Sequence, residues 1–234
     1  MLKAELHIHT GSDPKDTYIN YSNKEIIDEM KRRGYDVLAI TCHNKYFDDK
    51  KTLEYAKHKG IILIEGIEKT IDKKHVLVYN APKKEVEKAK TLDDLWEIKN
   101  KNKDVLIIAP HPYFIGSTCL KNEILRYKNL FDSYEISFFY TRGFDMNKKT
   151  VKLAKKLNKP LVGNCDIHNI NFRGNVYTII NAKHNKKDII DAIKKGKTKV
   201  VRKPLPLSEF SRIFKNKVLM TLTYHLNKTF RKLK

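Results

Sequence analysis

The sequence of 234 residues contains only three cysteines, and no two of them form a C-x-x-C pair. This scarcity excludes a disulfide framework and a zinc ribbon, and it predicts a reducing compartment. Long apolar runs are missing as well. No stretch approaches the ~20 residues that span a bilayer, and the first residues lack the apolar segment of a secretion signal. We therefore expect a soluble, cytoplasmic protein without a transmembrane segment.

Acidic residues are scarce relative to basic ones: 27 Asp and Glu stand against 48 Lys and Arg, which gives a net charge of +21. Such an excess favours encounter with polyanions by long-range attraction and release of counterions. Candidate partners are a phosphorylated small molecule, a nucleotide or RNA substrate, and an anionic lipid surface. Lysine-rich composition also occurs in heat-adapted proteins, but glutamate normally rises with lysine there and the net charge stays small. The oligomeric state stays open.

Short apolar runs alternate with longer amphipathic segments, and 41% hydrophobic residues are enough for one sizeable core. One predicted helix begins at the capping box Ser22-x-x-Glu25 and ends near Gly34, and a later one begins at Asp145 or Asn147. The runs are rich in Val, Ile and Leu, as in buried parallel strands. About seven or eight such βα units predict an α/β fold closed into a barrel rather than an open sheet. The predicted strands cover residues 2–9, 37–41, 61–67, 75–80, 105–109, 134–138, 160–164 and 176–181.

The composition changes after Val201, so we expect a barrel over residues 1–201 and a basic extension over 202–234. Residues 202–207 contain two prolines and are typical of an extended connector. Beyond them, apolar residues at steps of four predict an amphipathic helix. We expect its apolar stripe to pack on the barrel or on a second subunit; an anionic lipid surface or RNA are the alternative partners. The stripe consists of Phe210, Phe214, Val218, Leu222, Leu226 and Phe230.

Six of the nine histidines fall at or next to ends of predicted strands, and five of these ends are carboxyl ends, where a parallel barrel carries its active site. His7 and His9 alternate along one strand, so both imidazoles face one side and can hold one metal ion. Asp166 and His168 repeat this geometry further along. His75 instead begins its strand and is the least secure member. Hydrogen-bonded histidines in a core are the plainer explanation of any one of these residues.

The number of nitrogen and oxygen donors exceeds the roughly three protein ligands that one catalytic zinc ion needs. We therefore expect two or three divalent ions, with Glu68 as a bridge because a carboxylate offers two oxygens. A ligand shell without thiolate suits Zn, Mn or Fe. The predicted metal ligands are His7, His9, Asp13, His43, Glu68, His75, His111, Asp166 and His168.

The order of these motifs resembles the PHP family, the polymerase and histidinol phosphatase domain, over roughly residues 1–180. The segments that carry the resemblance are His7-Ile8-His9-Thr10 with Ser12-Asp13, Thr41-Cys42-His43, Gly66-Ile67-Glu68, His75-Val76-Leu77-Val78-Tyr79, Ala109-Pro110-His111-Pro112 and Asp166-Ile167-His168. Cys42 stands where the family has aspartate, and Pro110 interrupts the family's Ala-His pair. Asp13 stands where some members have histidine, which leaves the occupancy of a third metal site open.

The resemblance implies a distorted (β/α)7 barrel with three metal ions and phosphoesterase activity. The implied ligand sets are His7, His9, Glu68 and Asp166 for one ion, Glu68, His75 and His111 for a second, and His43 and His168 with Asp13 or water for a third. A metal-activated water would attack phosphorus. The predicted catalytic residues are His43, His168, Arg142 and Arg173, with the two arginines as cations that neutralise phosphoryl charge.

Glu135 lies within a predicted strand and is either a hydrogen-bond partner of a metal-binding imidazole or a core hydrogen-bonding residue. Cys42 and Cys165 are expected to be small buried residues rather than ligands. Glu65 is an alternative to Glu68 if the strand register is shifted. Two other functions compete with phosphoester hydrolysis. An amidohydrolase would need a bridging lysine, and no lysine is well placed; a PHP-like nucleic-acid-binding protein would be weakly catalytic or inactive.

Overall fold

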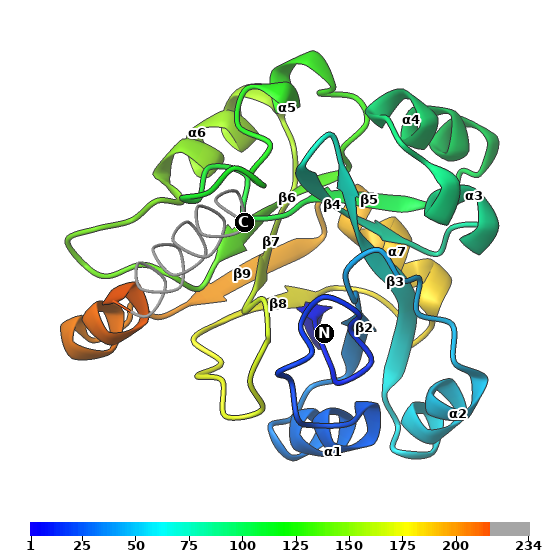
Figure 1. The fold of residues 1–234 in the computed structure, drawn as a ribbon, viewed down its shortest axis with the longest axis horizontal. Coiled ribbons are helices and arrows are strands. Elements are labelled where there is room, and N and C mark those ends of the chain that lie inside the picture. Colours follow the sequence, from blue (N-terminus) through cyan, green and yellow to red (C-terminus); the bar gives the residue numbers. More distant parts are fainter. Residues whose placement is uncertain (216–234) are drawn as a thin grey trace, which may run out of the picture.

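The computed structural model describes residues 1–215, which form one nine-stranded sheet surrounded by helices (Figure 1). Its order is β7-β6-β5-β4-β3-β2-β1-β8-β9. The strands are β1 (Leu2–Ile8), β2 (Val37–Ile40), β3 (Ile62–Ile71), β4 (Lys74–Tyr79), β5 (Leu106–Ala109), β6 (Ser133–Ser137), β7 (Leu161–Asn164), β8 (Val176–Ile180) and β9 (Thr198–Arg202). The helices are α1 (Asn23–Arg32), α2 (Lys50–His58), α3 (Lys83–Lys88), α4 (Leu92–Lys101), α5 (Glu123–Arg126), α6 (Lys148–Leu157) and α7 (Lys186–Lys194), followed by helical residues 207–215.

The eight predicted strands are all present, and the mixed α/β fold is a nearly closed, TIM-like barrel. Both hydrogen bonds of the predicted capping box are present at the start of α1. The Ser22 side chain accepts from the main-chain nitrogen of Glu25, and the Glu25 side chain accepts from the main-chain nitrogen of Ser22. Asn147 occupies the predicted cap of α6, but its side chain binds the main chain of Ser137 instead of the helix. The end of β6 is thereby tied to the start of α6.

The expectation of parallel strands is wrong for β4 and β8. β4 runs antiparallel to both β3 and β5, and β8 runs antiparallel to β1. A two-residue turn at Asp72 and Lys73, both with positive φ, joins β3 to β4. A connection this short makes a hairpin and leaves no room for the helix that a parallel crossover needs.

β9 has no counterpart among the predicted strands, and its last residue, Arg202, lies in the predicted connector. This strand pairs antiparallel with β8. It was missed because only Val200 and Val201 are apolar and no residue of it is fully buried. Its pairing partner, rather than its own composition, therefore fixes it as a strand.

The barrel closes between β7 and the antiparallel pair of β8 and β9, without a regular backbone ladder. Thr178 Oγ1 accepts a hydrogen bond from Gly163 N at 2.8 Å and donates to Gly163 O at 3.0 Å, and Thr198 Oγ1 donates to Leu161 O. A Cβ atom on Gly163 would come within 2.7 Å of side-chain carbons of Val176 and Val200. Glycine therefore permits the close approach that closes the barrel.

Apolar side chains from β1–β5, β7, β8 and α7 form one buried cluster that supports the carboxyl end of the barrel. Leu6, Leu77, Ile108 and Val162 are among its fully buried members. Ile189 of α7 belongs to the same cluster. Burial of each such side chain stabilises the fold by about 1.5–3 kcal/mol, which makes the strands a rigid platform for polar residues at their ends.

The first part of the C-terminal extension packs on the barrel. Leu205 N donates to Tyr140 O at 2.8 Å, and the Phe210 ring stacks on Phe139 with centroids 4.3 Å apart. The apolar positions at Val218, Leu222, Leu226 and Phe230 lie outside the described residues. Within residues 1–215, no helix is both long and apolar enough to cross a membrane.

Candidate metal centre

All nine predicted metal-binding side chains meet at one rim of the barrel. Two backbone hydrogen bonds, His9 N to Ile167 O and Ile167 N to His7 O, join the end of β1 to the loop after β7. A bridge between His43 and Glu68 joins the loop after β2 to β3. His75 is the second residue of β4, but because β4 is antiparallel, its first residues reach the rim where the parallel strands end. The antiparallel hairpin of β3 and β4 therefore explains why His75, at the start of its strand, lies with histidines that follow the ends of theirs.

Glu68 lies at the centre of the histidines and is 1% exposed. Its two carboxylate oxygens lie within 3.5 Å of five imidazoles: His75 Nδ1 at 2.7 Å, His43 Nε2 at 3.0 Å, His111 Nε2 at 3.4 Å, and His7 Nε2 and His9 Nε2 at 3.5 Å. Glu65, the alternative carboxylate, instead pairs with Lys186 at 3.0 Å. The predicted register of β3 is therefore the one observed.

Asp166 is the second carboxylate among the histidines. Its Oδ1 lies 2.9 Å from His168 Nε2, 3.2 Å from His7 Nε2 and 3.4 Å from His9 Nε2. Opposite it, His111 stands between two prolines with a φ of 30°. A positive φ in a histidine is strained, and such strain is characteristic of functional sites. Pro110 does not remove His111 from the cluster.

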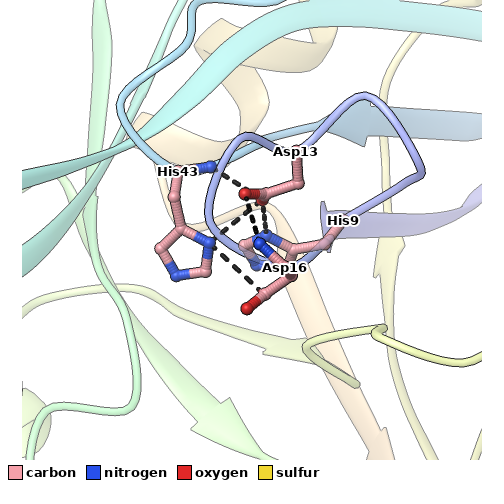
Figure 2. A group of neighbouring side chains, drawn as sticks. All are labelled: His9, Asp13, Asp16 and His43. Atoms are coloured by element: carbon pink, nitrogen blue, oxygen red, sulfur yellow. Dashed lines mark hydrogen bonds and ion pairs between the residues drawn. The ribbon is translucent and has the colours of Figure 1, made fainter. Parts of the chain in front are cut away.

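Asp13 accepts hydrogen bonds from two of the histidines rather than facing the centre (Figure 2). Its Oδ2 lies 2.7 Å from His9 Nδ1, 3.0 Å from His43 Nδ1 and 2.8 Å from the main-chain nitrogen of His43. Its Oδ1 accepts from the main chain of Lys15 and Asp16. Both oxygens are therefore engaged, and Asp13 fixes the orientation of both imidazoles.

Glu135 fixes the orientation of the His7 imidazole, as Asp13 does for His9 and His43. It is fully buried in β6, and its Oε2 lies 3.0 Å from His7 Nδ1. A carboxylate that accepts from one ring nitrogen leaves the other free as an acceptor for a metal ion. Of the two roles expected for Glu135, the geometry matches the partner of a metal-binding imidazole.

Asp16, Tyr18 and Glu5 also belong to the site and were missed from the sequence. Asp16 Oδ2 lies 2.9 Å from His168 Nδ1, and the Tyr18 hydroxyl lies 3.4 Å from the same nitrogen. Glu5 is fully buried and accepts hydrogen bonds from the main chain of His7 and Cys165. No motif marks them; for Asp16, its place three residues after Asp13 in the same loop is the one available signal.

The carboxylates and imidazoles of the cluster stabilise each other's charged forms. Burial by itself would raise the pKa of Glu68, but the charge of His7 and the hydrogen bonds from His111 and His43 hold the pKa well below its usual range. Burial likewise disfavours protonated His43, yet Asp13 and Glu68 raise its pKa to about 9. Asp166 and Asp16 outweigh burial at His168 and raise its pKa to about 9. Without cations, the rings of His43 and His168 therefore carry protons that balance the neighbouring carboxylates.

The donor atoms fit divalent cations. The Nε2 atoms of His7, His9 and His75 are buried and make no hydrogen bond, although carboxylate oxygens lie within 3.5 Å of the first two. A buried nitrogen without a hydrogen bond is costly unless a cation or water meets it. Three groups of donors have ligand atoms within 4.8 Å of one another. They are His7, His9 and Asp166; His43, Glu68 and His75; and His9, Asp13, Asp16 and His43. Carboxylates and imidazoles without thiolate are donors that Zn, Mn and Fe accept.

The two predicted arginines differ in position. Arg173 lines a cavity of about 760 Å³ that reaches Asp166 and His168, and it pairs with Glu209. Arg142 is exposed and does not line this cavity. Arg212 lines the cavity too, and no sequence motif marks it.

The cysteines do not join the described cluster as close ligands. Cys42 is buried, with its sulfur 3.7 Å from the Thr10 hydroxyl, and burial raises the pKa of its thiol to about 11. The Cys165 thiol donates to Val176 O. Cys119, which the sequence analysis left unassigned, lies with its sulfur 3.6 Å from His111 Nδ1.

Comparison with known proteins found a match to one family model and several solved structures with a similar fold. A family model described as PHP-associated matches residues 145–198. Among solved structures, a two-domain protein from Bacteroides vulgatus that contains a predicted PHP-like metal-dependent phosphoesterase has a TM-score of 0.66 and 18% identity, over 92% of this chain and 69% of that one. PsfC from Pseudomonas syringae has a TM-score of 0.63 and 18% identity over 97% and 98%. An amidohydrolase from Chromobacterium violaceum, with bound sulfate and no metal, has a TM-score of 0.56 and 13% identity over 71% and 87%.

Among curated proteins, none matches the sequence significantly. The structural likenesses have low identity and define the fold. The PHP-associated match over residues 145–198 agrees with the ordered motifs, which resemble the PHP family.

Proposed function

We propose that this protein is a metal-dependent phosphoesterase that hydrolyses a phosphomonoester or the phosphate ester of a nucleotide or oligonucleotide. The observation that carries this proposal is the position of the buried Glu68 carboxylate, which lies within 3.5 Å of five imidazoles and lines a cavity of about 140 Å³. A structural core has no need for so many ionisable groups, because burial of each is costly. Two or three divalent ions would satisfy them.

The residues suggest how such ions would be held. His7, His9 and Asp166 offer one set of donors, and His43, Glu68 and His75 offer another, with His111 and His168 beside them. When bound, the ions would lower the pKa of a water molecule and neutralise charge on the phosphoryl oxygens. Asp13 and Glu135 would hold the imidazoles in position, and Arg173 would attract the anionic substrate.

The test is elemental analysis of the purified protein, followed by a panel of aryl phosphates, nucleotides and short RNA with and without manganese. We expect metal-dependent hydrolysis that chelation abolishes. Asp166→Asn should lower metal content and activity together, because Asp166 contacts three of the rings. Asp104→Asn is the matched control, since Asp104 is exposed and outside the cluster. Chelator-insensitive or absent turnover across the panel would contradict the proposal.

The net charge of +21 favours a second candidate, a PHP-like nucleic-acid-binding protein with little or no activity. Binding of RNA that weakens with salt but is unchanged in His9→Ala would support it. Loss of metal-dependent turnover in the same variant would support the phosphoesterase. The two functions are therefore separated by one substitution and two measurements.

A further inference from the structure

The cavity of about 760 Å³ lies directly beside the metal centre. It shares Asp166, His168 and Phe138 with the smaller cavity that contains Glu68. A phosphoryl group held at Asp166 and His168 would therefore have its leaving group in the larger space. This volume is within the range of sites that bind small organic molecules.

Six Phe and Tyr side chains line this cavity. Phe138, Phe139 and Phe172 come from the barrel loops, whereas Phe214 comes from helical residues 207–215. The Phe210 ring, which stacks on Phe139, holds these helical residues against the barrel. The beginning of the C-terminal extension is thus part of the cavity. Flat rings are the ligands that such a wall accommodates best.

One charged pair interrupts the apolar wall. Arg173 Nη1 donates to the Glu209 carboxylate, and the side chains are 45% and 21% exposed. Apart from Asp166 at the metal centre, Glu209 is the only acidic residue lining this cavity within residues 1–215. Arg212 lines the cavity as well. A ligand that brings its own anion could therefore replace Glu209 as the partner of Arg173.

We propose that this cavity binds the leaving group of the substrate, an aromatic alcohol whose anionic substituent displaces the Glu209 carboxylate from Arg173. The inference rests on the proposed phosphoesterase function and narrows its substrate class. Hydrolysis breaks the bond between phosphorus and the leaving oxygen, forms a bond from a water oxygen to phosphorus, and transfers a water proton to the leaving oxygen. The products are phosphate and the aromatic alcohol.

The test compares 2-naphthyl phosphate with 6-carboxy-2-naphthyl phosphate, which differ only in the carboxylate. We expect the carboxylated substrate to have the higher kcat/KM. Arg173→Gln should lower the ratio of the two kcat/KM values, carboxylated over uncarboxylated substrate, about tenfold, because the charge-assisted hydrogen bond to the added carboxylate is lost. Glu209→Gln should raise it about threefold, because the competing carboxylate is gone. A purely structural ion pair would shift both variants in the same direction.

Binding of the product, 6-hydroxy-2-naphthoate, provides a readout that needs no turnover. Calorimetry should give weaker binding in Arg173→Gln and tighter binding in Glu209→Gln. Arg32→Gln is the charge-matched control, because Arg32 is a 70% exposed residue of α1. For the wall, Phe214→Ala should weaken binding about fivefold through lost apolar contact, whereas Leu207→Ala, which is 73% exposed and outside the cavity, should not.

The outcomes separate this inference from the proposed function. Metal-dependent release of phosphate with equal kcat/KM for both naphthyl phosphates would overturn the inference alone. Shifts of equal sign in Arg173→Gln and Glu209→Gln would overturn it as well. Absence of metal-dependent phosphate release from every aryl phosphate would overturn the proposed function, and the inference with it.

Discussion

At the scale of single residues, the site depends on carboxylates that orient histidines. Asp13 accepts from one ring nitrogen of His9 and one of His43, so each ring presents its other nitrogen to the centre. Asp13→Asn would keep the shape but replace one acceptor oxygen by an amide donor. We expect a loss of about 10- to 100-fold in metal affinity, the usual effect of removing such a partner.

Calorimetric titration of chelator-treated protein with manganese checks this expectation. Asp104→Asn again serves as control, because it makes the same chemical change at an exposed position. Unchanged affinity in Asp13→Asn would show that Asp13 does not orient the two rings.

Cys42 stands where the PHP family has aspartate, and its surroundings predict that the thiol is not a ligand. It is 1% exposed, and its closest polar neighbour is the Thr10 hydroxyl. We expect Cys42→Ser to retain metal content and activity and to lower stability by about 1 kcal/mol, because a hydroxyl is harder to bury than a thiol. Elemental analysis and denaturant unfolding measure the two effects. A drop in metal content with unchanged stability would place Cys42 at the site.

At the scale of elements, barrel closure depends on Gly163 in β7. A Cβ there would meet Val176 and Val200 at 2.7 Å, closer than carbon atoms approach without displacement. We expect Gly163→Ala to destabilise the protein by about 1–3 kcal/mol, the usual cost of overpacking. Thermal or denaturant unfolding gives the value.

Gly143→Ala provides the comparison, because a Cβ at Gly143 meets no atom within 4 Å. The two variants add the same methyl group, so a difference between them reports packing alone. Equal stability in both would mean that the β7–β8 seam is looser than the structure has it.

The hairpin of β3 and β4 illustrates what element patterns can and cannot predict. Short apolar runs rich in Val, Ile and Leu predicted both strands, since that pattern is local. Their relative direction depended on the turn at Asp72 and Lys73, which lacks the glycine or asparagine that marks most two-residue hairpins. The antiparallel direction is the feature that brings His75 to the rim.

At the scale of the whole molecule, metal binding should be coupled to protons. In the absence of cations, burial opposes protonation of the rings, but neighbouring acids and hydrogen-bond partners raise the pKa of His43 to about 9, of His168 to about 9 and of His111 to about 10. A metal ion binds the neutral ring, so these protons must leave. Metal affinity should therefore rise with pH between 6 and 9, about tenfold per unit for each proton released.

Titrations at pH 6, 7.5 and 9, each in two buffers of different ionisation enthalpy, count the released protons directly. A pH-independent affinity, or proton uptake on binding, would contradict this coupling. Saturating metal should also raise the Tm, since a ligand that binds only the folded state stabilises it.

The sequence by itself determined the composition of the site and most of the strands. Two histidines at alternate positions of a strand, such as His7 and His9, face the same side of the sheet because side chains alternate along a strand. Strand-end placement predicted a common rim, because parallel strands in a barrel end together. The motif order added the resemblance to the PHP family.

Only the tertiary structure decided which polar groups contact one another in the site. Which oxygen of Asp13 meets which nitrogen, and that Asp16 and Glu5 join the site, depends on loops and strands meeting from distant parts of the chain. The same holds for β9 and for the wall of helical residues 207–215, whose positions are fixed by pairing and packing partners. Local sequence encodes which face a side chain takes, whereas its neighbours across the fold are set by the packing of the whole barrel.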